Sequence, residues 1–250
     1  MRRSVSLLRS ASLNGLRSDR LESTLPLPLR RTVVIEGNIA SGKTECLEYL
    51  SRNPNIQTIA EPVDKWRNVR GHNTLDLMYK DPARWSLTLQ TYVQLTMMQA
   101  HATQQTRPVK VMERSIFSAK YCFVENLRTA GLMPPVEYAV LSEWFDWLIT
   151  NWHLEVDLIV YLRTKPEIVC ERLRKRHRSE EMAVTLDYLS KLHNLHEDWL
   201  TDGRFPVPCH VVTVDANADL ESVQKQCERE ITNRFFPENA AEARQAIAHS

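Results

Sequence analysis

Short apolar runs alternate with longer amphipathic segments along most of the chain. The short runs are rich in valine, isoleucine and leucine, and several are apolar throughout, as expected for strands covered by helices on both faces. Five strands are predicted, at residues 32–36, 57–60, 109–112, 157–162 and 209–214. Helix-length segments occupy residues 43–52, 82–104, 116–128, 136–151, 166–176 and 186–200. This alternation predicts a parallel sheet in a three-layer α/β domain.

The composition is typical of a globular protein, with 43% hydrophobic and 25% charged residues in a chain of 250. This length suffices for one large α/β domain or two small ones. No apolar run approaches the roughly 18 to 20 residues of a membrane-spanning helix, so we expect no membrane partner. The five cysteines are scattered without a C-x-x-C pair, which argues against a disulfide framework or a zinc ribbon.

Positive charge is concentrated near the start of the sequence. Residues 1–31 hold seven arginines and two acidic residues, which gives a net charge of +5. Because the whole chain carries +1, the net charge of the remaining chain is −4. The body therefore lacks the basic excess that nucleic-acid binding needs. Residues 1–18 are rich in arginine and serine and contain no acid, which is typical of an organellar transit peptide. We expect residues 1–31 to direct import into the mitochondrial matrix; the alternative is a basic tail on a cytoplasmic or nuclear protein.

A glycine-rich stretch follows the first predicted strand and opens the first predicted helix. It matches the phosphate-binding pattern G-x-x-x-x-G-K-[ST], which requires this strand-to-helix context. Glycines let successive N–H groups turn inward, and the helix N-terminus adds partial positive charge. Lys43 would reach the β- and γ-phosphates of a nucleoside triphosphate, and the Thr44 hydroxyl would ligate Mg²⁺. The predicted cradle consists of Gly37, Asn38, Ile39, Ala40, Ser41, Gly42, Lys43 and Thr44.

Phosphate binding alone leaves several protein classes open. The sequence lacks the NKxD and DxxG patterns of a switch GTPase, and it is too short for a large motor ATPase. A compact kinase remains, which needs a carboxylate for the acceptor hydroxyl and cations for the phosphate oxygens. Such groups belong at the carboxyl ends of parallel strands. Glu61 follows the second predicted strand and Glu113-Arg114 follows the third, although each alone also fits a solvated loop.

Several longer blocks carry a resemblance to a known family. They are EGNIASGKT, EPVDKWRNV, LMYKD, LQTYVQLTMM, MERSIFSAKYCFVEN, DLIVYLRTKPE and LHEDWL. Together they resemble the deoxyribonucleoside kinase family, nearest to its mitochondrial thymidine kinase and insect multisubstrate branches, over Thr32 to Leu200. The resemblance implies a three-layer P-loop kinase fold, with a five-stranded parallel sheet flanked by helices and a basic lid. It also implies ATP and Mg²⁺ as cofactors.

The resemblance assigns roles at the acceptor side. Glu61 would take the proton of the deoxyribose 5′-hydroxyl, and Arg114 would hydrogen-bond the same oxygen. Glu113 would serve the metal through bound water, beside Thr44. Tyr79 and Glu181 would hold the sugar 3′-hydroxyl, and a site with buried partners for a hydroxyl rejects ligands that lack it.

The base pocket is expected on the segment 82–104. Gln90, Val93 and Met97 are spaced i, i+3 and i+7 and share one helical face. Packing of this helical face into the hydrophobic core would explain Val93 and Met97, but a glutamine such as Gln90 is unusual on such a face. Its amide offers one donor and one acceptor, which match the edge of thymine or, when flipped, of cytosine.

Other residues would complete the base pocket. Trp66 and Phe123 would wall the ring with apolar surface. Family members selective for deoxycytidine and purines carry an Arg and an Asp where this chain has Met97 and Ala119. Without those charges there is room for the thymine methyl group, so we expect a preference for pyrimidines, thymidine included.

The stretch ERLRKRHRSEE is strongly basic at a predicted helix end. A solvated helix terminus, whose cations complement the helix dipole, is one interpretation. The resemblance instead implies a lid that closes on the transferred phosphate, with Arg172, Arg176 and Arg178 as its contacts. Glu180 and Glu181 would then couple lid closure to sugar binding. Glu45 departs from the threonine that close relatives carry after the lysine-threonine pair, and we expect its carboxylate to point away from phosphate.

The sequence thus predicts a Mg²⁺-dependent kinase that transfers the γ-phosphate of ATP to the 5′-hydroxyl of deoxynucleosides, preferably pyrimidines, for nucleotide salvage. Two alternatives stay open: a nucleoside monophosphate kinase, and a nucleotide sensor without turnover. The kinase domain is expected at 32–235, followed by a tail at 236–250. Trp144 and Trp147 fit core packing or a subunit contact, and the resemblance implies a homodimer.

Overall fold

The computed structural model describes most of the predicted kinase domain. The described residues are 30–152, 154–176, 178, 181 and 183–236. The predicted transit peptide lies outside them apart from residues 30 and 31, and the predicted tail lies outside them apart from residue 236. No helix in the described part of the chain is both long and apolar enough to cross a membrane.

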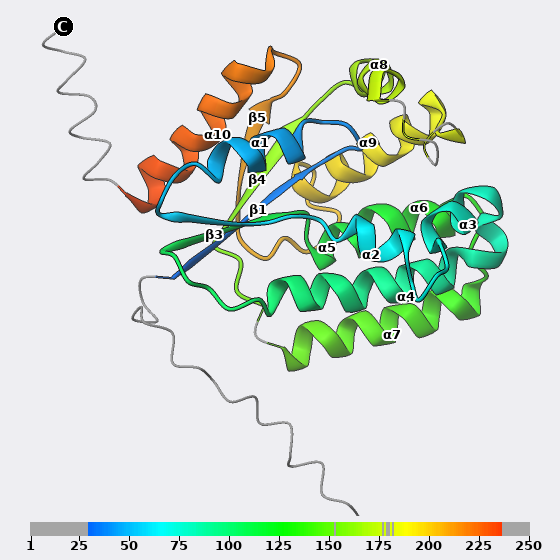
Figure 1. The fold of residues 1–250 in the computed structure, drawn as a ribbon. Helices are drawn as coiled ribbons and strands as arrows, with labels where there is room; N and C mark the ends of the chain where they lie inside the picture. Colours follow the sequence, from blue (N-terminus) through cyan, green and yellow to red (C-terminus); the bar gives the residue numbers. More distant parts are fainter. Residues whose placement is uncertain (1–29, 153, 177, 179–180, 182, 237–250) are drawn as a thin grey trace, which may run out of the picture.

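Five parallel strands form one sheet in the order β2-β3-β1-β4-β5 (Figure 1). Their bounds are β1 Arg31–Gly37, β2 Ile56–Ile59, β3 Val109–Glu113, β4 Leu158–Arg163 and β5 His210–Asp215. The register sets Ile35 of β1 beside Glu113 of β3, and Gly37 beside Leu162 of β4. The five-stranded parallel sheet predicted from the apolar runs is therefore confirmed.

Helices cover both faces of this sheet, as Figure 1 shows. On one face, α1 and α10 pack against the strands, and on the other lie α4, η2, α8 and α9, with α7 alongside α4. The helix bounds are α1 Lys43–Leu50, α2 Val63–Arg67, α3 Thr74–Lys80, α4 Pro82–His101, α5 Ile116–Ser118, η2 Ala119–Val124, α6 Glu125–Thr129, α7 Pro135–Asn151, α8 Pro166–Arg176, α9 Leu186–Leu200 and α10 Leu220–Phe235.

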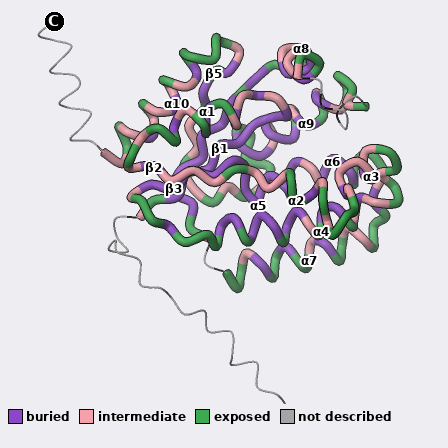
Figure 2. The backbone as a smooth tube through the Cα atoms, viewed as in Figure 1, coloured by how far each residue is buried: buried purple, intermediate pink, exposed green. Residues whose placement is uncertain are grey.

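The central strand β1 contributes side chains to the two largest clusters of the core. Val33 and Ile35 pack with α1 and α10, whereas Val34 packs with α4 and α9, because successive side chains of a strand point to opposite faces. All three side chains are fully buried, and Figure 2 shows buried backbone running through the sheet. Glu36 shares the face of Val34, so this face carries a buried carboxyl group at the end of the strand.

Three helices are absent from the sequence prediction, and one predicted helix is subdivided. Residues 116–128 form α5, the π-helical segment η2 and α6 instead of one regular helix. The short helices α2 and α3 lie within a loop-like stretch between β2 and α4. The helix α10 was missed because its few apolar positions stand among many charged ones. Asp219 caps its N-terminus, and the Asp219 Oδ1 accepts a hydrogen bond from the Ser222 N–H at 2.9 Å.

Candidate active site

A cavity of about 240 Å³ opens at the carboxyl ends of β1, β2 and β3. The chain leaves β1 toward α1 on one face of the sheet and leaves β3 toward η2 on the other. Adjacent parallel strands whose connections diverge in this way create a crevice at their carboxyl ends, where ligands of α/β proteins bind. The cavity lies at this crevice.

The glycine-rich loop forms one end of the cavity, with the residues from Ile39 to Thr44 on its wall. Gly37 lies beneath them with a φ of 146°, and a Cβ atom there would come within 2.7 Å of the Leu162 carbonyl oxygen. The loop can therefore pass this close to β4 only with glycine at this position. Asn38 ties the loop to α9, because its Nδ2 donates to the Leu189 carbonyl at 2.8 Å.

The Lys43 ammonium group is held inside the loop. Its Nζ donates to the carbonyl oxygens of Asn38 at 2.7 Å and Gly37 at 3.3 Å. Burial, followed by the positive charge of Arg114, lowers the pKa of Lys43 to about 8. At neutral pH the side chain therefore still carries its charge, in a place where a phosphate oxygen would meet little competition from water.

Thr44 and Glu113 bring two kinds of oxygen together beside this loop. The Thr44 hydroxyl on α1 donates to Glu113 Oε1 at the end of β3, with 2.7 Å between the two oxygens. Both residues line the cavity. Hydroxyl and carboxylate oxygens are the ligand types that Mg²⁺ prefers in proteins, so the pair fits the metal that the sequence predicts.

An ion pair forms the opposite part of the cavity wall. Arg114 Nε lies 3.0 Å from Glu61 Oε1, and the guanidinium rests 4.8 Å from the centre of the Phe123 ring. Arg114 has a left-handed backbone with φ 61°, and its N–H donates to the Ile35 carbonyl at 2.9 Å. Burial raises the pKa of Glu61, and the charge of Arg114 opposes that rise. A raised pKa makes this carboxylate a stronger proton acceptor than an ordinary glutamate.

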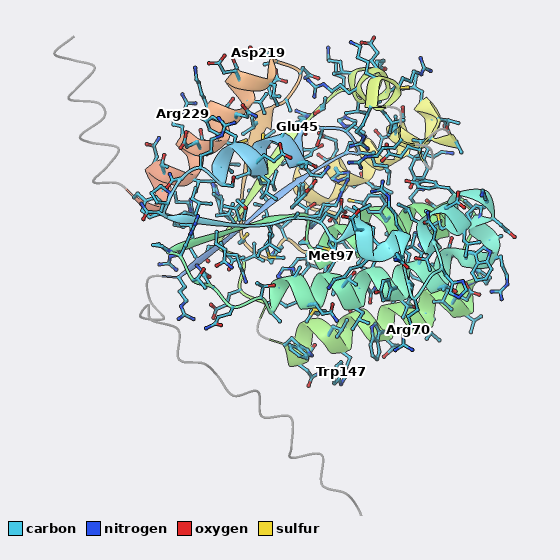
Figure 3. The ribbon with its side chains drawn as sticks, viewed as in Figure 1. Glu45, Arg70, Met97, Trp147, Asp219 and Arg229 are labelled. Atoms are coloured by element: carbon cyan, nitrogen blue, oxygen red, sulfur yellow. The ribbon has the colours of Figure 1, made fainter. Side chains whose placement is uncertain are left out.

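The remaining predicted substrate contacts gather around the rest of the cavity. Trp66 is fixed by a hydrogen bond from its Nε1 to Thr96 Oγ1 at 2.8 Å. Gln90 is buried, and its Oε1 has no hydrogen-bond partner among the described residues. Figure 3 shows Met97 in the interior of the molecule on α4. The cavity wall includes Trp66, Tyr79, Gln90, Val93, Met97, Ala119, Phe123 and Glu181, all eight of the predicted sugar and base contacts besides the ion pair.

Two of the three predicted lid arginines reach the cavity. Arg176 at the end of α8 pairs with Glu181, with Nε at 3.2 Å from Oε2, and Arg178 Nη1 lies 3.6 Å from Glu181 Oε1. Arg176, Arg178 and Glu181 all line the cavity. The predicted role of Glu180 falls on a residue outside the described part of the chain.

Arg172 lies apart from the other two lid arginines, and its predicted contact with the transferred phosphate stays a prediction. Its Nη2 donates to the carbonyl oxygens of Ala216 at 3.0 Å and Ala218 at 3.4 Å, between β5 and α10, and it does not line the cavity. Arg172 and Arg176 share one side of α8, but they stand one helical turn apart. The loop carbonyls bind the first of them, so only the second is directed to the cavity.

Ser115, Ser118 and Tyr188 are among the cavity-wall residues that sequence reasoning missed. Ser115 and Ser118 follow β3, and the Ser118 hydroxyl donates to the Ser115 carbonyl at 3.1 Å. Their spacing in ERSIFS, directly after a predicted strand, was a usable signal. Tyr188 on α9 lies in the same wall, and burial raises its pKa to about 12. No local pattern in the sequence marks Tyr188, because its place depends on how α9 docks.

Glu45 stands at the rim of the phosphate end. Its side chain is exposed on the first turn of α1, where Figure 3 labels it, and part of the residue borders the cavity. Its carbonyl accepts a hydrogen bond from Gln224 Nε2 of α10 at 3.1 Å. An exposed carboxylate at a helix N-terminus is favourable to the dipole, and its orientation away from a bound phosphate stays a prediction.

Comparison with known proteins gives concordant matches across this architecture. A family model described as deoxynucleoside kinase matches residues 33–236. The human protein "Thymidine kinase 2, mitochondrial" is 52% identical over 211 residues, covering 84% of this chain and 80% of its own, and the Macaca fascicularis protein of that name gives the same values. "Deoxycytidine kinase 2" of Gallus gallus is 34% identical over 233 residues, covering 81% of this chain and 88% of its own. The span matched by the family model includes every residue that lines the cavity.

Proposed function

Because this chain belongs to the deoxynucleoside kinase family, we propose that it transfers the γ-phosphate of ATP to the 5′-hydroxyl of deoxynucleosides, with pyrimidines preferred. The enzyme class and the use of ATP on small-molecule nucleosides follow from membership. The position of attack, the preference for pyrimidines and the residue roles are the parts that need argument. The single observation that carries the position of attack and the catalytic roles is that the Glu61–Arg114 pair and the Lys43 loop wall one cavity.

Glu61 is the group that receives the proton of the attacking hydroxyl. A general base works best when its pKa lies near the working pH, and burial moves the pKa of Glu61 upward. Arg114, at 3.0 Å from one of its oxygens, keeps the carboxylate in one orientation. The guanidinium has further N–H donors, one of which can bind the acceptor oxygen itself. The pair thus holds the attacking oxygen in line with the donor loop.

The cationic groups act on the other side of the reacting phosphorus. Lys43 stabilises negative charge on the β- and γ-phosphate oxygens from within the loop. Arg176 and Arg178 approach from the lid, where planar guanidinium groups bind phosphate oxygens through paired hydrogen bonds. In the structure both arginines interact with Glu181, so this carboxylate orders them beside the sugar end of the cavity.

Thr44 and Glu113 are the residues that would hold Mg²⁺. The oxygens of the two side chains are 2.7 Å apart and face the cavity beside the phosphate loop. When bound there, the ion would neutralise charge on the phosphates. The metal requirement is part of the proposal and is tested by omitting Mg²⁺ from the assay and titrating it back.

The pocket residues support a preference for pyrimidine bases. The only polar side chain in the wall formed by Gln90, Val93, Met97 and Ala119 is the Gln90 amide, which suits the polar edge of thymine or cytosine. Met97 and Ala119 are both buried and bring no charged group to this wall. Tyr79 and Glu181 supply the partners proposed for the sugar 3′-hydroxyl.

One assay tests this function against its alternatives. The purified protein is incubated with ATP and Mg²⁺ and with each of the four deoxynucleosides, thymidylate or uridine, and monophosphate or diphosphate formation is followed. We expect 5′-monophosphates from thymidine and deoxycytidine at the highest kcat/KM. Phosphorylation of thymidylate but not thymidine would instead identify a monophosphate kinase. Nucleotide binding without any product would identify a sensor.

A homodimer through α7 is proposed from its exposed apolar side chains. Val136, Val140, Trp144 and Trp147 are exposed by 69, 60, 45 and 54%, and the two indole rings stack at 6.1 Å (Figure 3 labels Trp147 on the outer side of α7). A row of this kind marks a protein interaction surface. Sedimentation should give a dimer for the wild type and a monomer for Trp147→Glu; a monomeric wild type would contradict the proposal.

Import into the mitochondrial matrix is also proposed. Its support is the arginine- and serine-rich, acid-free composition of residues 1–18, together with the word "mitochondrial" in the name of the two relatives at 52% identity. Residues 1–31 fused to a fluorescent protein should direct it to the matrix. Replacement of the seven arginines by glutamine should leave the fusion in the cytoplasm.

A further inference from the structure

Glu36 is a buried carboxyl group without an assigned role. It lies at the end of β1, directly before the phosphate loop, and its side chain is 0% exposed. Strand alternation directs it to the face covered by α4, η2 and α9, which is otherwise rich in apolar side chains. Burial raises the pKa of Glu36 to about 7, and the charge of Arg114 is the largest influence that opposes this rise. A carboxyl group in such surroundings is costly unless it is bound by neighbours.

The contacts of Glu36 lead to the acceptor end of the cavity. Its Oε1 accepts a hydrogen bond from the Ser115 hydroxyl at 2.6 Å. Its other oxygen has no hydrogen-bond partner in the described part of the chain. Ser115 directly follows Arg114 and lines the cavity, whereas Glu36 directly precedes the loop that holds Lys43. The Ser115–Glu36 hydrogen bond therefore connects the turn after β3 to the strand that carries the phosphate loop.

The turn that Glu36 reaches has an unfavourable backbone conformation. Arg114 has φ 61°, in the left-handed region that side chains other than glycine rarely adopt. Such a conformation persists only where neighbouring contacts hold it. Two contacts with β1 are available: the Arg114 N–H bond to Ile35 at 2.9 Å and the Ser115 hydroxyl bond to Glu36. The direction of the Arg114 side chain toward Glu61 depends on this turn.

We propose that Glu36 is a positioning residue for phosphoryl transfer, which through the Ser115 hydroxyl holds the Arg114 turn so that the guanidinium faces Glu61. This role rests on the function proposed above. Without the acceptor oxygen of Glu36, Ser115 loses its partner and Arg114 gains alternative orientations. The nucleoside still binds through its sugar and base contacts, but the attacking oxygen is less well aligned. Loss of alignment alone lowers kcat and leaves KM unchanged.

The test compares single and double variants in the thymidine assay. Glu36→Met has a similar length but no acceptor, and Ser115→Ala lacks the donor; each should lower kcat about 10-fold with KM for thymidine and ATP within about 2-fold of wild type. Because both changes break the same hydrogen bond, the double variant should also lose about 10-fold rather than about 100-fold. Glu36→Gln retains an acceptor oxygen and should stay within about 3-fold of wild type.

Glu125 provides a matched control for loss of a buried carboxyl group. It is 3% exposed, binds Arg128 Nε at 2.8 Å and the Tyr138 hydroxyl, and does not line the cavity. Glu125→Met should lower the thermal unfolding midpoint while kcat stays within about 2-fold of wild type. If Glu36→Met instead resembled this control, with lower stability and unchanged kcat, Glu36 would have only a structural role.

These kinetic measurements have further outcomes that would overturn the role proposed for Glu36. A rise in KM at constant kcat, or a double variant that loses about 100-fold, would overturn the proposal. Should Glu36→Met fail to fold, Ser115→Ala alone is decisive, because wild-type kcat in that variant would show that the hydrogen bond does not align Arg114. A wild-type protein that phosphorylates no deoxynucleoside would overturn the proposed function along with this role, whereas an active wild type with unaffected variants overturns this role alone.

Discussion

The two ends of the cavity are constructed in different ways. The loop at the phosphate end is one continuous stretch, residues 37–44, which contains both glycines and the lysine. The acceptor end is assembled from single side chains of separate elements, with Glu61 after β2, Arg114 after β3 and Gln90 on α4. A continuous loop recognises the phosphates that all nucleotides share, whereas dispersed side chains recognise one acceptor. This difference predicts that changes at the acceptor end are the more selective ones.

Among the variants, Glu61→Gln should show the largest difference between its effect on catalysis at the acceptor end and its effect on ATP binding at the phosphate end. The amide has nearly the same shape but cannot take up the proton, so kcat should fall about 10³-fold. The Kd for ATP, measured calorimetrically, should stay within about 2-fold, because the phosphate loop is untouched. A variant that kept more than about one tenth of the wild-type kcat would refute the assignment of Glu61 as the base.

Arg176→Ala examines the group that joins the two ends. Arg176 pairs with Glu181 at the sugar end and is proposed to bind the transferred phosphate, so kcat should fall about 10²-fold. Arg172→Ala is the matched control on the same helix, since Arg172 binds the carbonyls of Ala216 and Ala218. Single-turnover rates of the control should remain within about 2-fold of wild type. Equal losses of kcat in both variants would show that Arg172 also acts on the transferred phosphate.

Gln90→Leu addresses base recognition, which only the acceptor end supplies. The substitution removes both hydrogen-bonding groups at similar volume, and kcat/KM for thymidine and deoxycytidine should fall about 30-fold. Hydrolysis of ATP in the absence of nucleoside, a reaction of the phosphate end, should not change. If the rate of background hydrolysis fell in parallel, Gln90 would act on the loop and the two ends would not be separable.

The same difference explains how far the sequence alone could lead. The phosphate end was predictable because the spacing from Gly37 to Thr44 lies within one strand-to-helix junction. Glu61 and Arg114 were recognisable as charges at strand ends, but their meeting depends on the order β2-β3-β1, which no local pattern states. The resemblance supplied what the spacing could not.

Residues whose importance depends on burial escaped prediction. Glu36 looked like the last polar residue of a strand, and only the packing of η2 and α9 makes it a buried carboxyl group beside Ser115. Tyr188 required the docking of α9. Arg172 was assigned to the lid by the resemblance, although in the structure the loop before α10 binds it. In each case the deciding neighbour comes from a distant part of the chain.

His196 on α9 allows a final comparison, because charged residues from both ends of the cavity influence its pKa. Burial lowers its pKa to about 3, and the positive charges of Arg114 and then Lys43 act in the same direction. The unfolded chain takes up a proton as the pH falls through 6.5, but the folded chain does not until about 3. The free energy of unfolding therefore decreases by about 1.4 kcal/mol for each pH unit below 6.5 on account of this residue.

His196→Phe should remove that dependence while preserving the ring that stacks on Tyr161 at 6.0 Å. Between pH 6.5 and 5, the stability of the variant relative to wild type should rise by about 2 kcal/mol in urea unfolding. The stability of the variant has to be compared with that of wild type at each pH. Glu36, with its pKa raised to about 7, gives both proteins a pH dependence of stability of the opposite sign. A relative stability that is the same at both pH values would show that His196 takes up its proton at an ordinary pH, and that burial and the cations of the two ends do not keep it neutral.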